Sequence, residues 1–254
     1  MAQASRSPGG VDLLVTGGNG QLGRAVLQLA RERGLRAVGV DVAEMPLERR
    51  DAIVRTVQQH APRAVVHCGA ITNVDGCEAM PVDAYLVNGL ATGWIAQAAA
   101  AIDAALVYVG TDFVFDGKAS APYAPDAVPN PLSVYGGSKR LGELAVLAHG
   151  RDDFWVVRTS WVFGPGGRNF PRAILDRARS GLPLKVVTDQ IGRPTMTLDL
   201  ADALLDVVAL RPPGGIYHAA NEGECSWHGF AVEVLRAAGV GHVEVGEQTA
   251  AELQ

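Results

Sequence analysis

The stretch Thr16-Gly17-Gly18-Asn19-Gly20-Gln21-Leu22-Gly23 decides the fold. It follows a short apolar run at Val11–Val15 and opens a segment in which apolar residues recur at helical spacing as far as Gly34. Spaced glycines alone also occur in ordinary turns, but between a strand and a helix they let the backbone approach a pyrophosphate at the positive helix end. The stretch therefore predicts the start of a dinucleotide-binding fold. The residues expected to contact the dinucleotide are Gly17, Gly20, Gln21, Leu22 and Gly23.

A second apolar run, Ala37–Val40, ends at Asp41. In a dinucleotide-binding fold, a carboxylate at this point bonds the hydroxyls of the adenosine ribose and disfavours a 2′-phosphate, which favours NADH. The alternative is a solvated aspartate in a strand-end turn. Arg24 and Arg36 lie near enough in the sequence to leave NADPH open. We therefore expect a bound NADH or NADPH, with the choice between the two cofactors open.

Further apolar runs at Ala64–His67, Ala105–Val109 and Trp155–Arg158 alternate with segments of helical periodicity. Strands that alternate with helices of about ten to fifteen residues form a parallel sheet with helices on both faces. We therefore predict an α/β fold with a Rossmann-type doubly wound parallel sheet. The helical segments are expected at about Ala52–Gln59, Ala91–Ala101, Ser133–His149 and Phe170–Ser180.

Glycine and proline become more frequent after Phe163, which indicates that the chain leaves the nucleotide-binding fold there and later returns. We assign residues 11–165 to an NAD(P)-binding domain, to which the chain returns at about 198–218. Residues 166–197 and 219–254 are assigned to a small C-terminal substrate-binding cap. The proline-rich segment Ala119–Pro131 is too long for a simple connector, and long loops of this kind usually have a function.

The composition favours a globular protein that acts on a small molecule. The chain has 254 residues, of which 48% are hydrophobic and 19% charged. Its net charge of −5 disfavours a nucleic-acid partner. No stretch approaches the roughly eighteen uncharged apolar residues that span a bilayer, and the polar Met1–Gly10 lacks the apolar core of a signal peptide. We therefore expect no membrane partner and a cytoplasmic location.

No metal site is expected. The cysteines are odd in number and lack a CxxC spacing, and no two of the six histidines have a spacing typical of metal ligands. Buried or incidental thiols are the simpler interpretation. The cysteines are Cys68, Cys77 and Cys225.

Tyr135 and Lys139 form a YxxxK pattern near the start of a predicted helix. Residues four apart share one helix face, so the phenol and the ammonium can address the same substrate atom. A nearby lysine cation stabilises phenolate and lowers the tyrosine pKa from about 10. Thr111 directly follows the strand at 105–109, where a hydroxyl points into the ligand crevice of an open α/β sheet. Together with the glycine-rich stretch at 16–23, which we call the glycine loop, these residues indicate a dehydrogenase site.

Longer motifs accompany these residues and cover most of the chain. With them, the sequence resembles the dTDP-4-dehydrorhamnose reductase group of the extended short-chain dehydrogenases. The stretches that carry this resemblance are Gly17–Gly23, TDFVFDG at 111–117, NPLSVYGGSK at 130–139, Gly142-Glu143, RTSWVFG at 158–164, Asn169-Phe170, DQIGRPT at 189–195 and GIYH at 215–218.

The resemblance implies that Thr111, Tyr135 and Lys139 form the catalytic triad. The implied reaction is hydride transfer from NADH or NADPH to the C4 ketone of a dTDP-linked 4-keto-6-deoxy sugar. Tyr135 would protonate the developing alkoxide and Thr111 would hydrogen-bond the same oxygen. Lys139 would hold a hydroxyl of the nicotinamide ribose. A homodimer stays open.

The resemblance also implies a group of residues around the sugar nucleotide, each of which has a structural alternative. The alternative for Asp112 and Asn169 is a turn-forming residue that bonds its own backbone. Trp161 is as well explained as a core aromatic at the cap junction, and Arg193 as a partner of Asp189. The residues that the resemblance places around the substrate are Asp112, Trp161, Asn169 and Arg193.

The sequence departs from the family pattern in three places. Gly110 and Phe113 replace a serine and a tyrosine beside the Thr-Asp pair, and this leaves the sugar open. Met45–Glu48 replaces the usual acidic motif after the second strand. The sequence also ends at Gln254, before the family's usual C-terminal Arg-Pro.

Two rival functions fit the same motifs. A sugar-nucleotide dehydratase or epimerase would share the fold, but dehydratases of this group typically have a glutamate where this chain has Phe113. A non-catalytic, NAD(P)-binding regulatory subunit would also share the fold, since fold alone does not confer activity. The retained triad disfavours that second rival.

Overall fold

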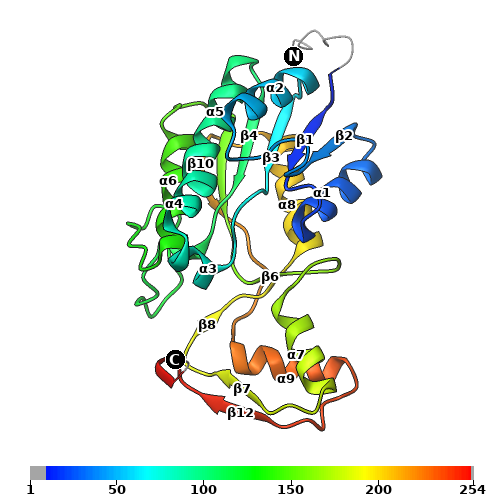
Figure 1. The fold of residues 1–254 in the computed structure, drawn as a ribbon, viewed down its shortest axis with the longest axis vertical. Coiled ribbons are helices and arrows are strands. Elements are labelled where there is room, and N and C mark those ends of the chain that lie inside the picture. The colour runs from blue at the N-terminus through cyan, green and yellow to red at the C-terminus, as the bar shows by residue number, and fades with distance from the viewer. Residues whose placement is uncertain (1–9, 253–254) are drawn as a thin grey trace.

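A parallel six-stranded sheet forms the centre of the protein, in the strand order β10-β5-β4-β3-β1-β2 (Figure 1). The structure, a computed structural model, describes residues 10–252; the start of the polar N-terminal stretch and residues 253–254 of the expected cap lie outside them. The predicted doubly wound parallel sheet is confirmed. Its strands are β1 (Leu13–Thr16), β2 (Ala37–Val40), β3 (Ala64–His67), β4 (Ala105–Val109), β5 (Phe154–Arg158) and β10 (Gly215–His218).

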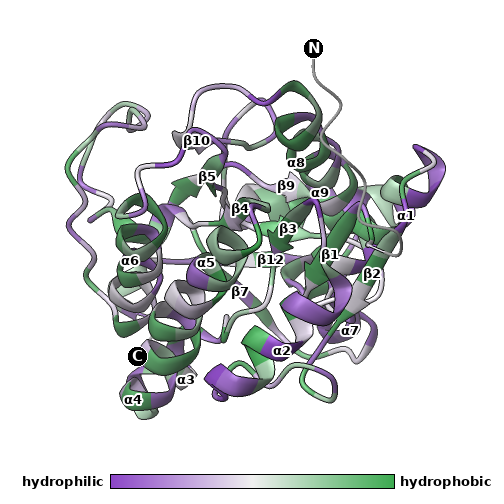
Figure 2. Ribbon diagram, turned by 90° about the horizontal axis from the view of Figure 1, so that it is seen from above, coloured by the Kyte–Doolittle hydropathy of each residue, from purple (hydrophilic) through white to green (hydrophobic). Residues whose placement is uncertain are grey.

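Helices cover both faces of this sheet, because successive strand residues point to opposite faces. Leu14 and Leu106 pack on one side against helices α2, α5 and α6. Val15 and Trp155 pack on the other side against α1 and α8. Figure 2 shows apolar strands between the two helix layers. The helices are α1 (Gln21–Glu32), α2 (Arg50–His60), α5 (Ala91–Ala101), α6 (Val134–Leu147) and α8 (Thr197–Leu210).

Short helical segments before α5 were not predicted from the sequence. Each has four to six residues and contains either a glycine or a proline, so it shows little helical periodicity. Asn88, in the last of them, fixes that segment in place: its side chain bonds both backbone groups of Ile71 and the hydroxyl of Ser138 in α6. The segments are α3 (Val74–Ala79), α4 (Pro81–Ala84) and the π-helix η1 (Tyr85–Leu90).

A smaller body lies beyond the carboxyl ends of the sheet strands (Figure 1). In it, α7 (Phe170–Arg179) and α9 (Trp227–Ala237) pack on β7 (Leu184–Val187) and β12 (Val245–Gln248), which pair in parallel. Ile174, Leu184 and Leu235 belong to its separate apolar core. Two short strands, β6 (Val162–Phe163) and β9 (Thr195–Met196), pair with each other, and two more, β8 (Ile191–Gly192) and β11 (Cys225–Ser226), form a second pair. Val162 of β6 packs against the core of the central sheet. Two 3₁₀ turns, η2 (Asp112–Val114) and η3 (Ala250–Glu252), complete the fold.

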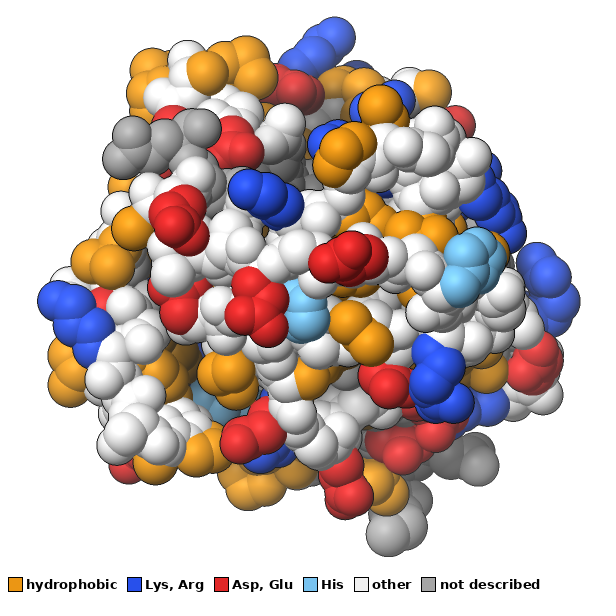
Figure 3. Space-filling model, turned by 90° about the horizontal axis from the view of Figure 1, so that it is seen from below, with side chains coloured by type: hydrophobic (Ala, Val, Ile, Leu, Met, Phe, Trp, Pro, Cys, Tyr) orange, Lys and Arg blue, Asp and Glu red, His pale blue; other side chains and the backbone are white. Residues whose placement is uncertain are grey.

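Acidic and basic side chains are interspersed on the face seen from the side of this smaller body (Figure 3). Between residues 10 and 252, no helix is long and apolar enough to cross a membrane. Over the same range, no group of three or more His, Cys, Asp or Glu side chains is arranged to hold a metal ion.

Gly23→Ala is expected to destabilise the protein by about 2 kcal/mol, because its new Cβ would overlap the carbonyl oxygen of Gly17. Chemical denaturation measures the loss. Gly229→Ala in α9 is the control: a Cβ there has its nearest neighbour at 3.5 Å, so stability should change by less than about 1 kcal/mol. Equal stability of the two variants would contradict the close packing of Gly23 on the backbone of Gly17.

Candidate active site

The sequence-predicted residues of the loop and of the triad line a single cavity of 770 Å³ at the carboxyl ends of the strands. The cavity lies where the chain changes direction across the sheet, since β1 lies between β2 and β3. Open α/β sheets bind their ligands at such a switch point. The predicted residues that line the cavity are Gly17, Gly20, Gln21, Leu22, Gly23, Asp41, Thr111, Asp112, Tyr135, Lys139 and Trp161.

The glycine loop leaves room for a ligand against the end of α1. Gly17 has φ of +63°, a conformation that favours glycine, and a Cβ there would lie 2.9 Å from the backbone of Gly69. Gly20 is the N-cap of α1 and has no side chain to bond the first backbone N–H groups of the helix. These groups, together with the positive helix end, suit a pyrophosphate. The residues present therefore fit a dinucleotide.

Asp41 has its carboxylate fixed beside this loop. One oxygen accepts a hydrogen bond from the backbone N–H of Asn19 and the other from that of Val42, each at 2.9 Å. Arg36 lies within 3.4 Å of Asp12, whereas Arg24 lies near Gly166. Beyond Asp41 the cavity wall continues with Met45, Leu47 and Glu48, the stretch that departs from the family pattern.

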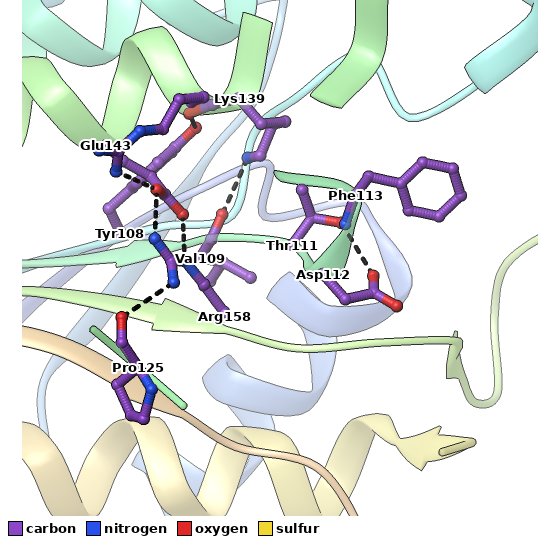
Figure 4. Close-up of polar contacts among 10 residues, drawn as sticks. Tyr108, Val109, Thr111, Asp112, Phe113, Pro125, Lys139, Glu143 and Arg158 are labelled. Atoms are coloured by element: carbon purple, nitrogen blue, oxygen red, sulfur yellow. Dashed lines mark hydrogen bonds and ion pairs between the residues drawn. The ribbon is translucent and has the colours of Figure 1, made fainter. Parts of the chain in front are cut away.

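Lys139 is buried one helical turn after Tyr135 in α6. Its Nζ donates to the carbonyl oxygen of Val109 at 2.8 Å and lies 4.3 Å from the centre of the Tyr108 ring (Figure 4). Burial lowers the pKa of Lys139 to about 8, while the nearby Glu143 carboxylate opposes the change. The ammonium is therefore charged at neutral pH but close to its titration range.

Tyr135 is also buried, and burial raises the pKa of its phenol to about 12, with the Thr111 hydroxyl acting in the opposite direction. The lowering of this pKa that the sequence predicted from Lys139 is therefore wrong, because burial disfavours the charged phenolate more than its neighbours favour it. The phenol is therefore protonated at neutral pH. The ring of Phe113 packs edge-on against that of Tyr135 at 5.5 Å between centroids. A protonated phenol in the wall of the cavity is suited to donate a proton to an oxygen that gains negative charge.

Thr111 and Asp112 lie where β4 ends. The Thr111 hydroxyl accepts from the backbone N–H of Phe113 and donates to the Asp112 carboxylate, both at 3.2 Å (Figure 4). Burial raises the pKa of Asp112 to about 6, and the hydrogen bond from Thr111 opposes this rise. Both side chains line the cavity beside Tyr135, so the turn both caps η2 and presents polar groups to a ligand.

A buried ion pair behind the site was not foreseen as such. Glu143 of α6 accepts two hydrogen bonds from Arg158 of β5, at 2.8 and 2.9 Å (Figure 4). It accepts a third from Arg140 at 2.8 Å. Arg158 also donates to the carbonyl oxygen of Pro125 in the proline-rich loop. Glu143 and Arg158 both occur in the motifs that carry the resemblance, but nothing in the sequence pairs them.

A buried polar chain beneath the site was also missed. His67 of β3 bonds the hydroxyl of Thr16 at 2.6 Å and that of Thr92 at 3.1 Å. Thr16 in turn accepts from the backbone N–H of Gly69. Burial lowers the pKa of His67 to about 3, with Lys139 adding to the effect, so the imidazole is neutral. A single histidine within an apolar run was the only available signal.

Trp161 and Asn169 lie at the junction with the smaller body. Trp161 stacks on Trp227 with ring centroids 3.6 Å apart, in a backbone conformation with φ of +46°. Asn169 is the N-cap of α7, where its Oδ1 accepts from the backbone N–H of Arg172. Its Nδ2 donates to the Gly164 carbonyl oxygen, and the residue does not line the cavity.

Arg193 is half-buried and lies outside the residues that line the cavity. Its backbone carbonyl oxygen accepts from the Ser160 hydroxyl at 2.7 Å. Asp189 accepts from the backbone N–H of Ala250, and within residues 10–252 no ion pair joins it to Arg193. The structure thus gives no support to a brace between these two side chains.

Residues 11–253 match the model of a protein family described as the RmlD substrate binding domain. The chain belongs to this family. It is 39% identical over 244 residues to a dTDP-4-dehydrorhamnose reductase of Streptomyces griseus, covering 94% of this chain and 80% of that protein. It is 38% identical over 228 residues to the spore coat polysaccharide biosynthesis protein SpsK of Bacillus subtilis, covering 90% of this chain and 80% of that protein.

Solved structures show the same similarity. A dTDP-4-dehydrorhamnose reductase from Clostridium acetobutylicum superposes with a TM-score of 0.91 at 36% identity, covering 95% of this chain and 85% of that chain. A dTDP-4-dehydrorhamnose reductase from Bacillus anthracis, in complex with NADP, also gives a TM-score of 0.91, at 30% identity, covering 96% of this chain and 86% of that chain.

The replacement at Gly110 has a physical basis in this RmlD family member. A Cβ at Gly110 would lie 3.0 Å from Cγ of Arg158 and 3.2 Å from Oε1 of Glu143. A serine there would therefore require the buried ion pair to shift by a few tenths of an ångström. Phe113, the second replacement, is partly exposed and lines the cavity, so it gives that wall an apolar surface in place of a hydroxyl.

The value of kcat/KM for the dinucleotide is expected to fall as the pH rises through about 8, because Lys139 loses its proton there. A steady-state pH profile with NADH and NADPH measures this. Lys139→Arg should lack the fall between pH 7 and 9, whatever its absolute rate, since a guanidinium keeps its charge. A flat profile for the unaltered protein up to pH 9.5 would contradict the assignment.

Proposed function

We propose that the protein reduces the C4 ketone of a dTDP-linked 4-keto-6-deoxy sugar with NADH or NADPH. One observation carries the proposal: Thr111, Tyr135 and Lys139 line the same cavity as the glycine loop. The printed names of relatives support the substrate class, since one from Streptomyces griseus is a dTDP-4-dehydrorhamnose reductase and one from Streptomyces niveus is a dTDP-4-keto-6-deoxy-D-glucose reductase.

The residues of the loop would hold the pyrophosphate, and Asp41 would accept from the hydroxyls of the adenosine ribose. Lys139 would bind a hydroxyl of the nicotinamide ribose. When bound, the dinucleotide supplies the hydride. The protein's own residues position the two reactants and provide the charges around them.

Tyr135 would donate its proton to the carbonyl oxygen as that oxygen becomes an alkoxide. An alkoxide is far more basic than phenolate, so a phenol with a pKa near 12 is still acidic enough for this transfer. The Thr111 hydroxyl donates its one proton to Asp112 in this structure and would turn it to the same substrate oxygen. The Lys139 cation would stabilise the phenolate that remains. Apolar side chains pack around the Tyr135 ring and would limit the access of water to this step.

The remaining substrate contacts belong to the same proposal. Asp112 and Trp161 line the cavity and would face the sugar. Arg193, without an ionic partner among the described residues, would reach the diphosphate when the smaller body closes. Asn169, as the N-cap of α7, would act through the loop before it rather than by direct contact.

The two parts of the chain would bind different ligands. Residues 11–165 with 198–218 would bind the dinucleotide, and residues 166–197 with 219–254 would form the substrate-binding cap. The separate apolar core of the smaller body supports this division. We place the reaction in the cytoplasm, where nucleotide sugars and reduced dinucleotides are made.

The two rivals differ in observable products. A dehydratase needs a base that removes a carbon-bound proton, and Phe113 beside Thr111 offers none. An epimerase would return the dinucleotide unchanged, and a regulatory subunit would bind it without turnover. Mixing stoichiometric NADH or NADPH with a panel of dTDP-4-keto sugars separates these functions, because only the reductase oxidises the dinucleotide and forms a 4-hydroxy sugar.

Tyr135→Phe is expected to lower kcat by about 10²- to 10⁴-fold, the usual contribution of a general acid. The dissociation constant for NADH should change less than about threefold, since the ring is kept. Tyr217→Phe is the matched control, because its hydroxyl bonds the Pro213 carbonyl oxygen outside the cavity. Retention of a third of kcat by Tyr135→Phe, under conditions where chemistry limits the rate, would rule out the proton-donor role.

Asp41→Asn is expected to raise kcat/KM with NADPH relative to NADH by about tenfold, equivalent to about 1.4 kcal/mol. The amide removes the negative charge that repels a 2′-phosphate but can still accept a hydrogen bond from the N–H of Asn19. Steady-state kinetics with both dinucleotides measures the ratio. A strong NADPH preference of the unaltered protein would show that Asp41 does not select the cofactor.

A further inference from the structure

Gln21 is the first residue of α1, and its side chain reaches from the glycine loop to the smaller body. Its Nε2 donates to the carbonyl oxygen of Val162 in β6 at 3.2 Å. Its Oε1 accepts from Nδ2 of Asn169 at 3.2 Å. One side chain thus bonds two segments that lie more than 140 residues further along the chain.

Asn169 continues this link into α7. Its Oδ1 accepts from the backbone N–H of Arg172 at 3.1 Å, and its Nδ2 also donates to the Gly164 carbonyl oxygen at 2.7 Å. The chemistry of the partners fixes both amides: Arg172 N–H needs an acceptor, and the carbonyl oxygens of Val162 and Gly164 need donors. A continuous chain of hydrogen bonds therefore joins the N-terminal ends of α1 and α7.

The loop between these contacts packs closely on Gln21. A Cβ at Gly167 would lie 3.0 Å from the Cβ of Gln21, so the backbone of this loop lies almost against the side chain. Gly166, Gly167 and Arg168 of the loop line the same cavity as the glycine loop. Val162 of β6 also pairs with Thr195 of β9, and Thr195 is the last residue of the DQIGRPT stretch that contains Arg193.

Glutamine suits this position because the two contacts need opposite groups. Val162 offers a carbonyl oxygen and Asn169 offers an amide N–H, so the side chain between them must donate and accept at once. A glutamate would present two acceptors and a leucine neither group.

We propose that Gln21 is a positioning residue that couples dinucleotide binding to the cap and, through the cap, to nucleotide-sugar binding. This inference rests on the proposed function. The backbone of Gln21 belongs to the helix end that would bind the pyrophosphate, while its side chain holds the entry to α7. A ligand that orders the backbone also orders the side chain, so α7 becomes more stable without touching the ligand.

Hydrogen exchange measures this coupling directly. In the unaltered protein, saturating NADH or NADPH is expected to slow amide exchange in residues 17–23. Exchange in residues 170–179 of α7 should slow by about fivefold as well, although none of these residues lines the cavity. In Gln21→Leu, the protection of residues 17–23 should persist, while the ligand-dependent protection of α7 is lost.

Asn169→Asp breaks the link from its other end. An aspartate still accepts from the Arg172 N–H and so keeps the N-cap of α7, but it cannot donate to Gln21. It should lose the same ligand-dependent protection, and the double variant should lose no more than either single one. Gln28→Leu is the matched control, because Gln28 lies in the same helix and, among residues 10–252, its side chain bonds only Glu32. This variant should behave like the unaltered protein.

The outcomes are distinct. If α7 gains equal protection from the dinucleotide in Gln21→Leu and in the unaltered protein, the coupling does not pass through Gln21 and the proposal is wrong. The proposal is equally wrong if the ligand protects residues 17–23 but never α7. If no dinucleotide protects residues 17–23 of the unaltered protein, the proposed function fails and this inference fails with it.

Discussion

The ammonium of Lys139 is buried, and the arrangement of three neighbouring elements follows from the need to stabilise it. A charge taken out of water is costly unless polar groups surround it. Here β4 contributes a carbonyl oxygen and the face of the Tyr108 ring, and α6 contributes the Glu143 carboxylate. Glu143 is itself held by Arg158 of β5. The sheet and α6 are thus fixed to each other by charge as well as by apolar packing.

This arrangement accounts for opposite pKa changes in two adjacent side chains. The same burial that lowers the pKa of Lys139 raises that of Tyr135, because burial disfavours the charged form of each group. The site therefore presents a neutral acid next to a cation at physiological pH. A reductase requires that combination, since the oxygen that it protonates becomes negative only when the hydride arrives.

The sequence predicted the sheet because its strands are continuous apolar runs between helices, and such runs need no tertiary information. It also predicted which polar residues follow the strands. It could not predict contacts between distant segments, such as Glu143 with Arg158, because nothing local in the sequence pairs them. Asn169 is an instructive case: an asparagine followed by Phe-Pro at a helix start is typical of an N-cap, yet resemblance alone favoured a substrate contact.

The stacked indoles of Trp161 and Trp227 join the segment after β5 to the first residue of α9. One ring belongs to the wall of the cavity and the other to the core of the smaller body. Two indoles in face-to-face contact share their excited states, so their absorption and emission depend on how the rings overlap. The protein thus carries a native optical probe at the junction between its two bodies, and rotation of one body against the other would change its near-ultraviolet spectrum without any added label.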